Sequence, residues 1–250
     1  MLGKLFFLLT NNILFNKILI SLKLDAMFIA RFGIYKRMKL DSTLSPQEMA
    51  GFSKKEEVQE AIDKTHDDLK KVVVSELKLG DAILDIGCGA GAYLKEFEED
   101  YDCTGIDLNS EMINAGKKYM PKATLLLDDF INHTFNKKFN LIYSVSVLEF
   151  IAPSKLKIFF EKVASLLQNN GIFFLHYPHA LKAIDLYFPD LYYIEYSPAL
   201  IESIATNKFA IQSHQHGWDN RTVSKYDLHS YQPGIRTFKN GYLLIAKLKS

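Results

Sequence analysis

Three glycines in one short segment carry the strongest chemical signal of this sequence. Gly87, Gly89 and Gly91 alternate with other residues in the segment LDIGCGAGA, residues 84–92. Glycine has no Cβ, so it lets the backbone turn sharply and approach a ligand closely. Residues 93–99 are compatible with a helix, whose first N–H groups would be free to bind a ligand. A strand, a glycine turn and a helix in this order predict a site for a nucleotide-like cofactor.

Two cofactors compete for this turn. The spacing Gly87-x-Gly89-x-x-Ala92 satisfies the dinucleotide pattern G-x-G-x-x-G/A, which is a weak signal when it stands alone. Asp85 lies at the carboxyl end of the preceding strand and favours the other candidate. A carboxylate there would repel a pyrophosphate, but it would tolerate the sulfonium and ammonium groups of S-adenosylmethionine (SAM). We therefore expect SAM.

Further acidic residues stand where the next two strands are expected to end. Asp107 closes the segment CTGID, and its carboxylate could accept hydrogen bonds from both ribose hydroxyls. NAD enzymes place an acid at the same point, so this residue does not discriminate between the cofactors. Asp128 and Asp129 follow the apolar segment ATLLL. An acid there could accept from the adenine amino group, and Phe130 could cover the ring or offer its backbone N–H.

These motifs resemble those of the class I SAM-dependent methyltransferases, including the small-molecule and ubiquinone-type enzymes. The resemblance covers roughly residues 55–215 and rests on ILDIGCGAG, GIDLN, LLLDDF and FNLIYSVSVLEFI. It implies that the glycines line the methionine moiety, that Asp107 contacts the ribose, and that Asp129 and Phe130 contact the adenine, with Val145 against the cofactor. The expected cofactor-binding residues are Asp85, Gly87, Cys88, Gly89, Gly91, Asp107, Leu108, Asp128, Asp129, Phe130 and Val145.

The resemblance also implies an architecture. We expect an α/β fold with a Rossmann-like, doubly wound sheet of seven strands, the last of them antiparallel, plus an N-terminal helical cap. The cap would span residues 1–53 and the methyltransferase domain residues 54–250. Two insertions, 177–196 and 214–241, would lie on the substrate side of the sheet, because open α/β folds bind ligands at its carboxyl edge.

One departure from the family concerns metal binding. The ubiquinone-type O-methyltransferases carry Glu-x-x-Glu-His after the fourth strand, linked to a divalent metal, but the matching segment here keeps only Glu149. One carboxylate is too few for a magnesium site held mainly by protein groups. His214-x-His216 has no carboxylate or cysteine partner at a ligand spacing, so we interpret these residues as surface or edge-strand histidines. We therefore expect no metal.

The N-terminal forty residues differ from the rest of the chain in charge. They carry a net charge of +6, while the whole chain carries only +1, which gives no global field to attract nucleic acid. Their longest uncharged run, residues 5–16, has twelve residues, whereas a membrane span needs about 20. Three interpretations stay open: a cap packed on the core, a lid over a lipophilic pocket, or an interfacial helix that contacts anionic lipid.

The expected partner is a small acceptor with a hydroxyl, amine or carbon nucleophile. Residues 177–196 contain six aromatic side chains, which suit a flat or lipophilic ligand, although these aromatics could equally form a core of their own. His176 and His179 flank the end of the expected fifth strand, 171–177, and either could serve as general base; each could also be a hydrogen-bonded structural histidine.

Three other functions are weighed against small-molecule methylation. An RNA or protein methyltransferase is disfavoured, because no basic stripe with interleaved aromatics crosses the core and no Asn-Pro-Pro-Tyr motif follows the fourth strand. A nicotinamide-dependent oxidoreductase conflicts with Asp85. A SAM-binding domain without turnover stays open. Cys88 and Cys103 are expected to be buried thiols in a reducing compartment, which favours the cytoplasm, with membrane association as the alternative.

Overall fold

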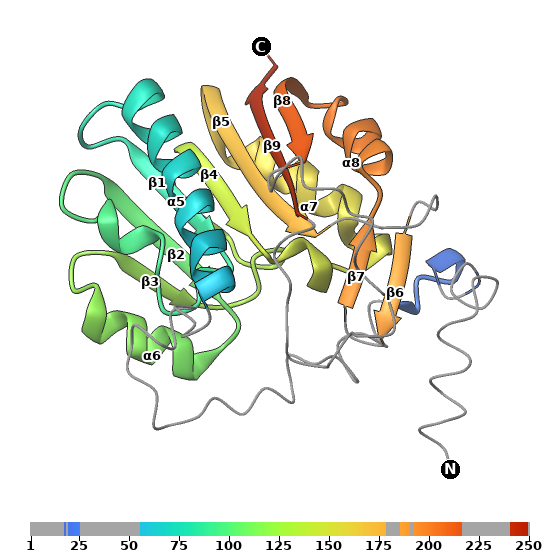
Figure 1. Cartoon of the computed structure of the whole chain (residues 1–250), viewed down its shortest axis with the longest axis horizontal. Helices are drawn as coiled ribbons and strands as arrows, with labels where there is room; N and C mark the ends of the chain where they lie inside the picture. The colour runs from blue at the N-terminus through green and yellow to red at the C-terminus, as the bar shows by residue number, and fades with distance from the viewer. Residues whose placement is uncertain are drawn as a thin grey trace.

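The computed structural model describes residues 18, 20–25, 56–178, 186–190, 193–216 and 241–249 (Figure 1). The elements in chain order are α5 (Glu56–Glu76), β1 (Ala82–Ile86), η2 (Leu94–Glu96), β2 (Asp102–Asp107), α6 (Ser110–Tyr119), β3 (Thr124–Leu127), β4 (Phe139–Val145), η3 (Leu148–Phe150), α7 (Pro153–Leu166), β5 (Leu167–Pro178), β6 (Leu186–Asp190), β7 (Tyr193–Tyr196), α8 (Pro198–Ala205), β8 (Phe209–His216) and β9 (Gly241–Leu248).

Seven strands form one mixed sheet in the order β3-β2-β1-β4-β5-β9-β8. The first five are parallel to one another, and β9 runs antiparallel to both β5 and β8, between which it lies. The expected seven-stranded, doubly wound sheet with an antiparallel last strand is therefore confirmed. The strand order reverses between β1 and β4, and in folds of this kind ligands bind beyond the carboxyl ends of the strands at that point.

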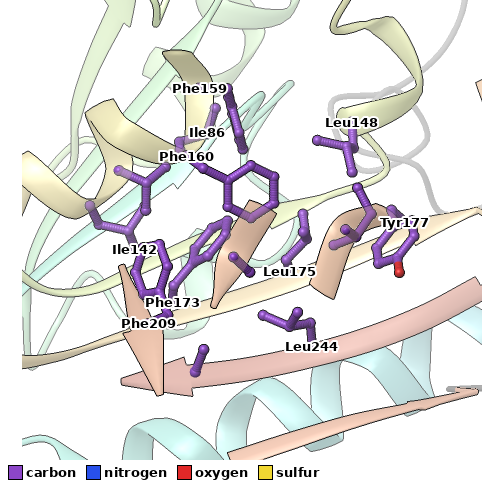
Figure 2. Close-up of a cluster of buried hydrophobic side chains, with 14 of the residues drawn as sticks. Ile86, Ile142, Leu148, Phe159, Phe160, Phe173, Leu175, Tyr177, Phe209 and Leu244 are labelled. Carbon is purple, nitrogen blue, oxygen red and sulfur yellow. The ribbon is translucent and has the colours of Figure 1, made fainter. Parts of the chain in front are cut away.

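Helices cover both faces of the sheet, as expected of parallel strands that are buried on both sides (Figure 1). On one face, α5 packs through Leu69 and Val73, and α6 through Ile113. On the other face, α7 and α8 cover a core rich in phenylalanine. Figure 2 shows Phe159 and Phe160 of α7 beside other buried side chains of this core, among them Phe173 of β5 and Phe209 of β8.

Local sequence signals explain where two helices begin. The side chain of Asn109 accepts hydrogen bonds from the backbone N–H groups of Glu111 and Met112, so it caps α6. Ser197 caps α8 by accepting from Leu200 N, and Pro198 occupies the first helical position.

The segments outside the seven-stranded sheet are only partly described. In the first insertion, β6 and β7 form a separate antiparallel pair; residues 217–240 of the second insertion lie outside the described residues. Most of residues 1–53 also lie outside them, and so does the proposed boundary between cap and domain. Residues 20–25 are described, and Asp25 accepts a hydrogen bond from Ser154 N at the start of α7 (2.8 Å). No helix in the described ranges is long and apolar enough to cross a bilayer.

Candidate functional site

The glycine turn joins β1 to η2 at the carboxyl edge of the sheet. Gly87, Gly89 and Gly91 have φ angles of +73°, +54° and +89°, a region that side chains with a Cβ rarely adopt. The N–H groups of Gly87 and Cys88 both donate to Ile106 O, at 2.8 and 3.2 Å. The end of β2 therefore fixes the start of the turn, and the three glycines are required by backbone conformation.

Side chains pack against the turn at Gly87 and Gly91, whereas the space beside Gly89 is open. A Cβ on Gly87 would lie 2.2 Å from Val147 Cγ2, and one on Gly91 would lie 1.7 Å from Met120 Cε. A Cβ on Gly89 would meet no heavy atom within 4 Å in the part of the chain that the structure describes. The backbone at Gly89 is thus the surface that a ligand can approach.

The predicted helix after the turn is wrong. Residues 93–99 form only the single 3-10 turn η2, and not an α-helix with a ligand-binding N-terminus. Beyond η2, the buried carboxylate of Glu98 accepts hydrogen bonds from the backbone N–H groups of Lys122 and Ala123, at 3.0 and 3.2 Å. This long-range contact fixes the chain before β2 begins at Asp102. Residues 93–99 therefore offer no helix N-terminus to a ligand.

Asp107 connects β2 to the glycine turn. Its Oδ2 accepts from Gly89 N (2.9 Å) and its Oδ1 from Asn109 N (2.8 Å). These two bonds tie the end of β2 to the glycine turn and to the start of α6, and the predicted role of Asp107 toward the ribose hydroxyls stays a prediction. Leu108, the next residue, is 57% exposed, which is unusual for a leucine beside a buried strand. Both residues lie at the carboxyl end of β2, and their contacts with a cofactor stay predictions.

Asp85 is buried, and this changes the charge that we expected of it. Burial raises the pKa of this carboxyl to about 8; the neighbouring Tyr143 hydroxyl opposes the shift and Asp107 adds to it. Tyr143 is the register partner of Asp85 on β4. Near pH 7 the Asp85 side chain is mostly protonated, so the repulsion of a pyrophosphate that we inferred from it is reduced.

The loop after β3 is ordered by its own acidic residues. Asp128, whose side chain is half exposed, pairs with His133 Nδ1 (2.9 Å); Asp129 Oδ1 accepts from Ile131 N (2.9 Å). Phe130 is 6% exposed, and its ring packs 5.5 Å from that of Phe159 in the core. The interpretation that Phe130 covers the adenine ring is therefore wrong, because its apolar side chain is used for packing; its backbone N–H remains a possible contact.

The ends of β4 and β5 meet beside the glycine turn. Val145 and His176 are register partners, and Ser146 N donates to His176 O (3.0 Å). Ser146 has a φ of +55°, an uncommon conformation for a non-glycine residue, and Val147 follows it onto Gly87. His176 is 2% exposed. His176 thus lies at the expected edge of the sheet, but its catalytic role stays a prediction. The other candidate base, His179, lies outside the described residues.

A second group of polar side chains, missed by sequence reasoning, links β5, β8 and α8. The hydroxyl of Tyr177 lies 2.7 Å from His214 Nε2, and His214 Nδ1 lies 2.9 Å from Glu202 Oε1. His214 stands on the edge strand β8, as expected, but its side chain is only 3% exposed. It is therefore not a surface histidine, because the hydrogen bonds on both ring nitrogens allow its burial.

The described residues do not indicate metal binding or a reactive thiol in this region. Within the described residues, no group of three or more His, Cys, Asp or Glu side chains is placed to hold a metal ion. Cys88 and Cys103 are free and buried, and burial raises the pKa of Cys103 to about 12. Both are structural thiols, as expected.

Comparison with known proteins agrees with this geometry. The sequence profile of a family described as "Methyltransferase domain" matches residues 83–171. The cyclopropane-fatty-acyl-phospholipid synthase of Escherichia coli K12 is 31% identical over 105 residues, which are 40% of this chain and 27% of that protein. Sphingolipid C9-methyltransferase 1 of Gibberella zeae is 31% identical over 116 residues, 42% of this chain and 23% of that protein. The chain thus spans about a quarter of the length of these curated relatives.

A solved structure supports the fold. The N-methyltransferase NodS of Bradyrhizobium japonicum, in complex with S-adenosylhomocysteine (SAH), superposes with a TM-score of 0.57 at 14% identity. The superposition covers 76% of this chain and 88% of that one. At this identity the likeness concerns the fold alone.

Proposed function

We propose that this chain carries a class I SAM-dependent methyltransferase domain and that it transfers the methyl group of SAM to a small, lipophilic acceptor. The observation that carries the proposal is the glycine turn: three positive φ angles, an open backbone at Gly89, and Asp107 beneath it. Such a turn lets a ligand approach the backbone closely, because Gly89 has no Cβ.

The residues of the site fit the parts of SAM. The open turn at Gly89 would hold the methionine moiety, Asp107 would accept from the ribose hydroxyls, and Asp128 or Asp129 from the adenine amino group. SAM supplies an activated methyl group on a sulfonium sulfur. The protein then has to align the acceptor, exclude water and, for a hydroxyl acceptor, remove one proton. His176 and His179 are our candidates for that base.

Two observations support a lipophilic acceptor. The names of these two relatives refer to lipids, a fatty-acyl phospholipid and a sphingolipid. In this chain, an insertion with six aromatic residues, 177–196, follows β5 in sequence, and of these residues Tyr177 and Tyr196 are buried in the core. We further propose that residues 1–53 form a cap on the domain 54–250, with the basic and apolar residues 1–40 contacting lipid; Asp25 on the start of α7 supports such a cap.

Calorimetric titration with SAH, beside NAD as the control ligand, tests the cofactor. We expect SAH to bind at micromolar concentration and NAD not to bind. Binding of NAD alone, or of neither ligand, would overturn the proposal.

Transfer of a radiolabelled methyl group from SAM tests the acceptor. The acceptors are phospholipid vesicles with unsaturated acyl chains, lipophilic phenols and amines, and a water-soluble catechol as the polar control. Labelling of the lipophilic acceptors supports the proposal; labelling of the catechol alone would contradict the lipophilic acceptor and leave the cofactor assignment intact.

A further inference from the structure

One lysine on α7 is directed at the loop that follows β3, far from it in sequence. Lys162 Nζ donates to the carbonyl oxygen of Ile131 (2.8 Å) and also to that of His133. The ammonium group lies 5.6 Å from the centre of the Phe130 ring and 6.0 Å from that of Phe135. Two kinds of contact therefore hold this loop against α7: charge-assisted hydrogen bonds to two carbonyl oxygens, and cation–π contacts with two rings.

His133 passes this restraint on to Asp128. Its backbone N–H donates to Asp129 O (2.8 Å), its ring packs 4.6 Å from that of Phe135, and its Nδ1 lies 2.9 Å from Asp128 Oδ2. The other oxygen of Asp128 accepts from Asp129 N (2.8 Å). Both carboxylate oxygens are thus fixed, although the side chain is half exposed.

Asp128 is also held in its ionised form. The hydrogen bond from His133 lowers the pKa of this carboxyl, the backbone N–H of Asp129 adds to the effect, and the charge of Lys162 contributes further. An ionised carboxylate can only accept hydrogen bonds. It therefore suits a partner that donates, such as an aromatic amino group, and disfavours a carbonyl oxygen at the same place.

We propose that Lys162 and His133 are positioning residues, which hold Asp128 where it reads the 6-amino group of the cofactor's adenine. This inference rests on the proposed SAM site. Lys162 fixes the backbone of His133, and His133 orients the Asp128 carboxylate. The two residues act through Asp128, so they set which purine the site accepts and not only how stable the loop is.

The test compares SAH with S-inosylhomocysteine, in which a carbonyl oxygen replaces the 6-amino group. Both affinities are measured by calorimetry for the full chain. The wild type should prefer SAH by about tenfold or more, the range of one charge-assisted hydrogen bond. His133→Phe keeps the aromatic packing but removes the hydrogen bond, so its preference should fall below about threefold.

Three further variants separate positioning from stability. Lys162→Met should lose the preference as well. His133→Asn keeps an N–H donor near the position of Nδ1 and should retain it. Lys157→Met is the matched control on α7, since Lys157 is exposed and pairs only weakly with Glu161 (3.8 Å); it should bind both ligands as the wild type does.

The outcomes distinguish this inference from the proposed function. If His133→Phe and Lys162→Met weaken both ligands equally and keep the ratio, the two residues are merely structural and the inference is overturned. A wild type that binds both ligands equally tightly also overturns it, while the SAM site stands. A wild type that binds neither ligand overturns the proposed function and this inference with it.

Discussion

Replacing Asp85 by asparagine should stabilise the protein, and the gain should grow with pH. The carboxyl is buried beside Tyr143, and its pKa is about 8 in the folded chain. In the unfolded chain the value is close to 4. Between these two values the folded state holds a proton that the unfolded state has released. Asp85 therefore favours unfolding increasingly as the pH rises through this window.

The magnitude follows from the size of the shift. Each pKa unit corresponds to about 1.4 kcal/mol, so at pH 7 the folded chain carries an unfavourable contribution on the order of 4 kcal/mol from Asp85. Asparagine has nearly the same shape and no proton to gain or lose. Asp85→Asn removes this contribution, provided that the amide keeps the contacts of the protonated acid.

Urea denaturation at two pH values measures the effect. Between about pH 5.5 and about pH 7.5, the wild type should lose roughly 2 to 3 kcal/mol of unfolding free energy through Asp85, and Asp85→Asn should not. Asp100→Asn is the control, because Asp100 is exposed, and it should show the pH dependence of the wild type. If Asp85→Asn and the wild type have the same pH dependence, Asp85 is ionised in the folded chain and our account of the β1 end is wrong.

Three other substitutions test the site and its surroundings. Asp107→Ala should weaken SAH binding about tenfold or more, since hydrogen bonds to the ribose and to Gly89 are lost; unchanged affinity by calorimetry would remove Asp107 from the site. Gly87→Ala should destabilise the chain by about 2 kcal/mol or more, because the new Cβ meets Val147 and the φ is positive. Adding Val147→Ala should recover only the steric part in a denaturation cycle; full recovery would show that the backbone conformation is not strained. Tyr177→Phe should cost about 1 to 3 kcal/mol, since His214 Nε2 loses its partner, and His214→Ala should then add less than it does alone; strictly additive effects would mean that the pair does not interact.

The sheet could be predicted from the sequence because each strand has its own local sequence pattern. Buried parallel strands read as apolar runs, and their acidic ends identify the ligand-binding edge. The glycine turn after β1 and Asp107 at the end of β2 were therefore predicted at the right places in the fold, while their roles toward a cofactor stay predictions. What failed depends on contacts between distant residues. Glu98 meets Lys122 and Ala123 across 24 and 25 positions, and no local pattern shows that this contact replaces a helix with a single turn.

The direction in which a side chain points also cannot be predicted from a local sequence pattern. Both expected roles of Phe130, covering the adenine ring and offering its backbone N–H, were inferred from its place after two acidic residues. That place does not show where the ring points, and only the packing against α7 shows that the ring belongs to the core. Tyr177, Glu202 and His214 come from three elements, and each residue alone carries no signal of its partners. Asp85 was found by its motif, but its protonation depends on burial among groups from β2 and β4.

The place of β9 between β5 and β8 has a consequence for how this chain is made. β9 comprises residues 241–248, yet it lies inside the sheet and pairs along both of its sides. During synthesis, β5 and β8 expose unpaired edges until these residues leave the ribosome, and exposed edges of apolar strands invite pairing with other chains. The joining of β5 to a strand more than sixty residues later also raises the contact order, which slows folding. β9 can insert between β5 and β8 only after both strands have been made, and the nascent chain exposes these two edges until then.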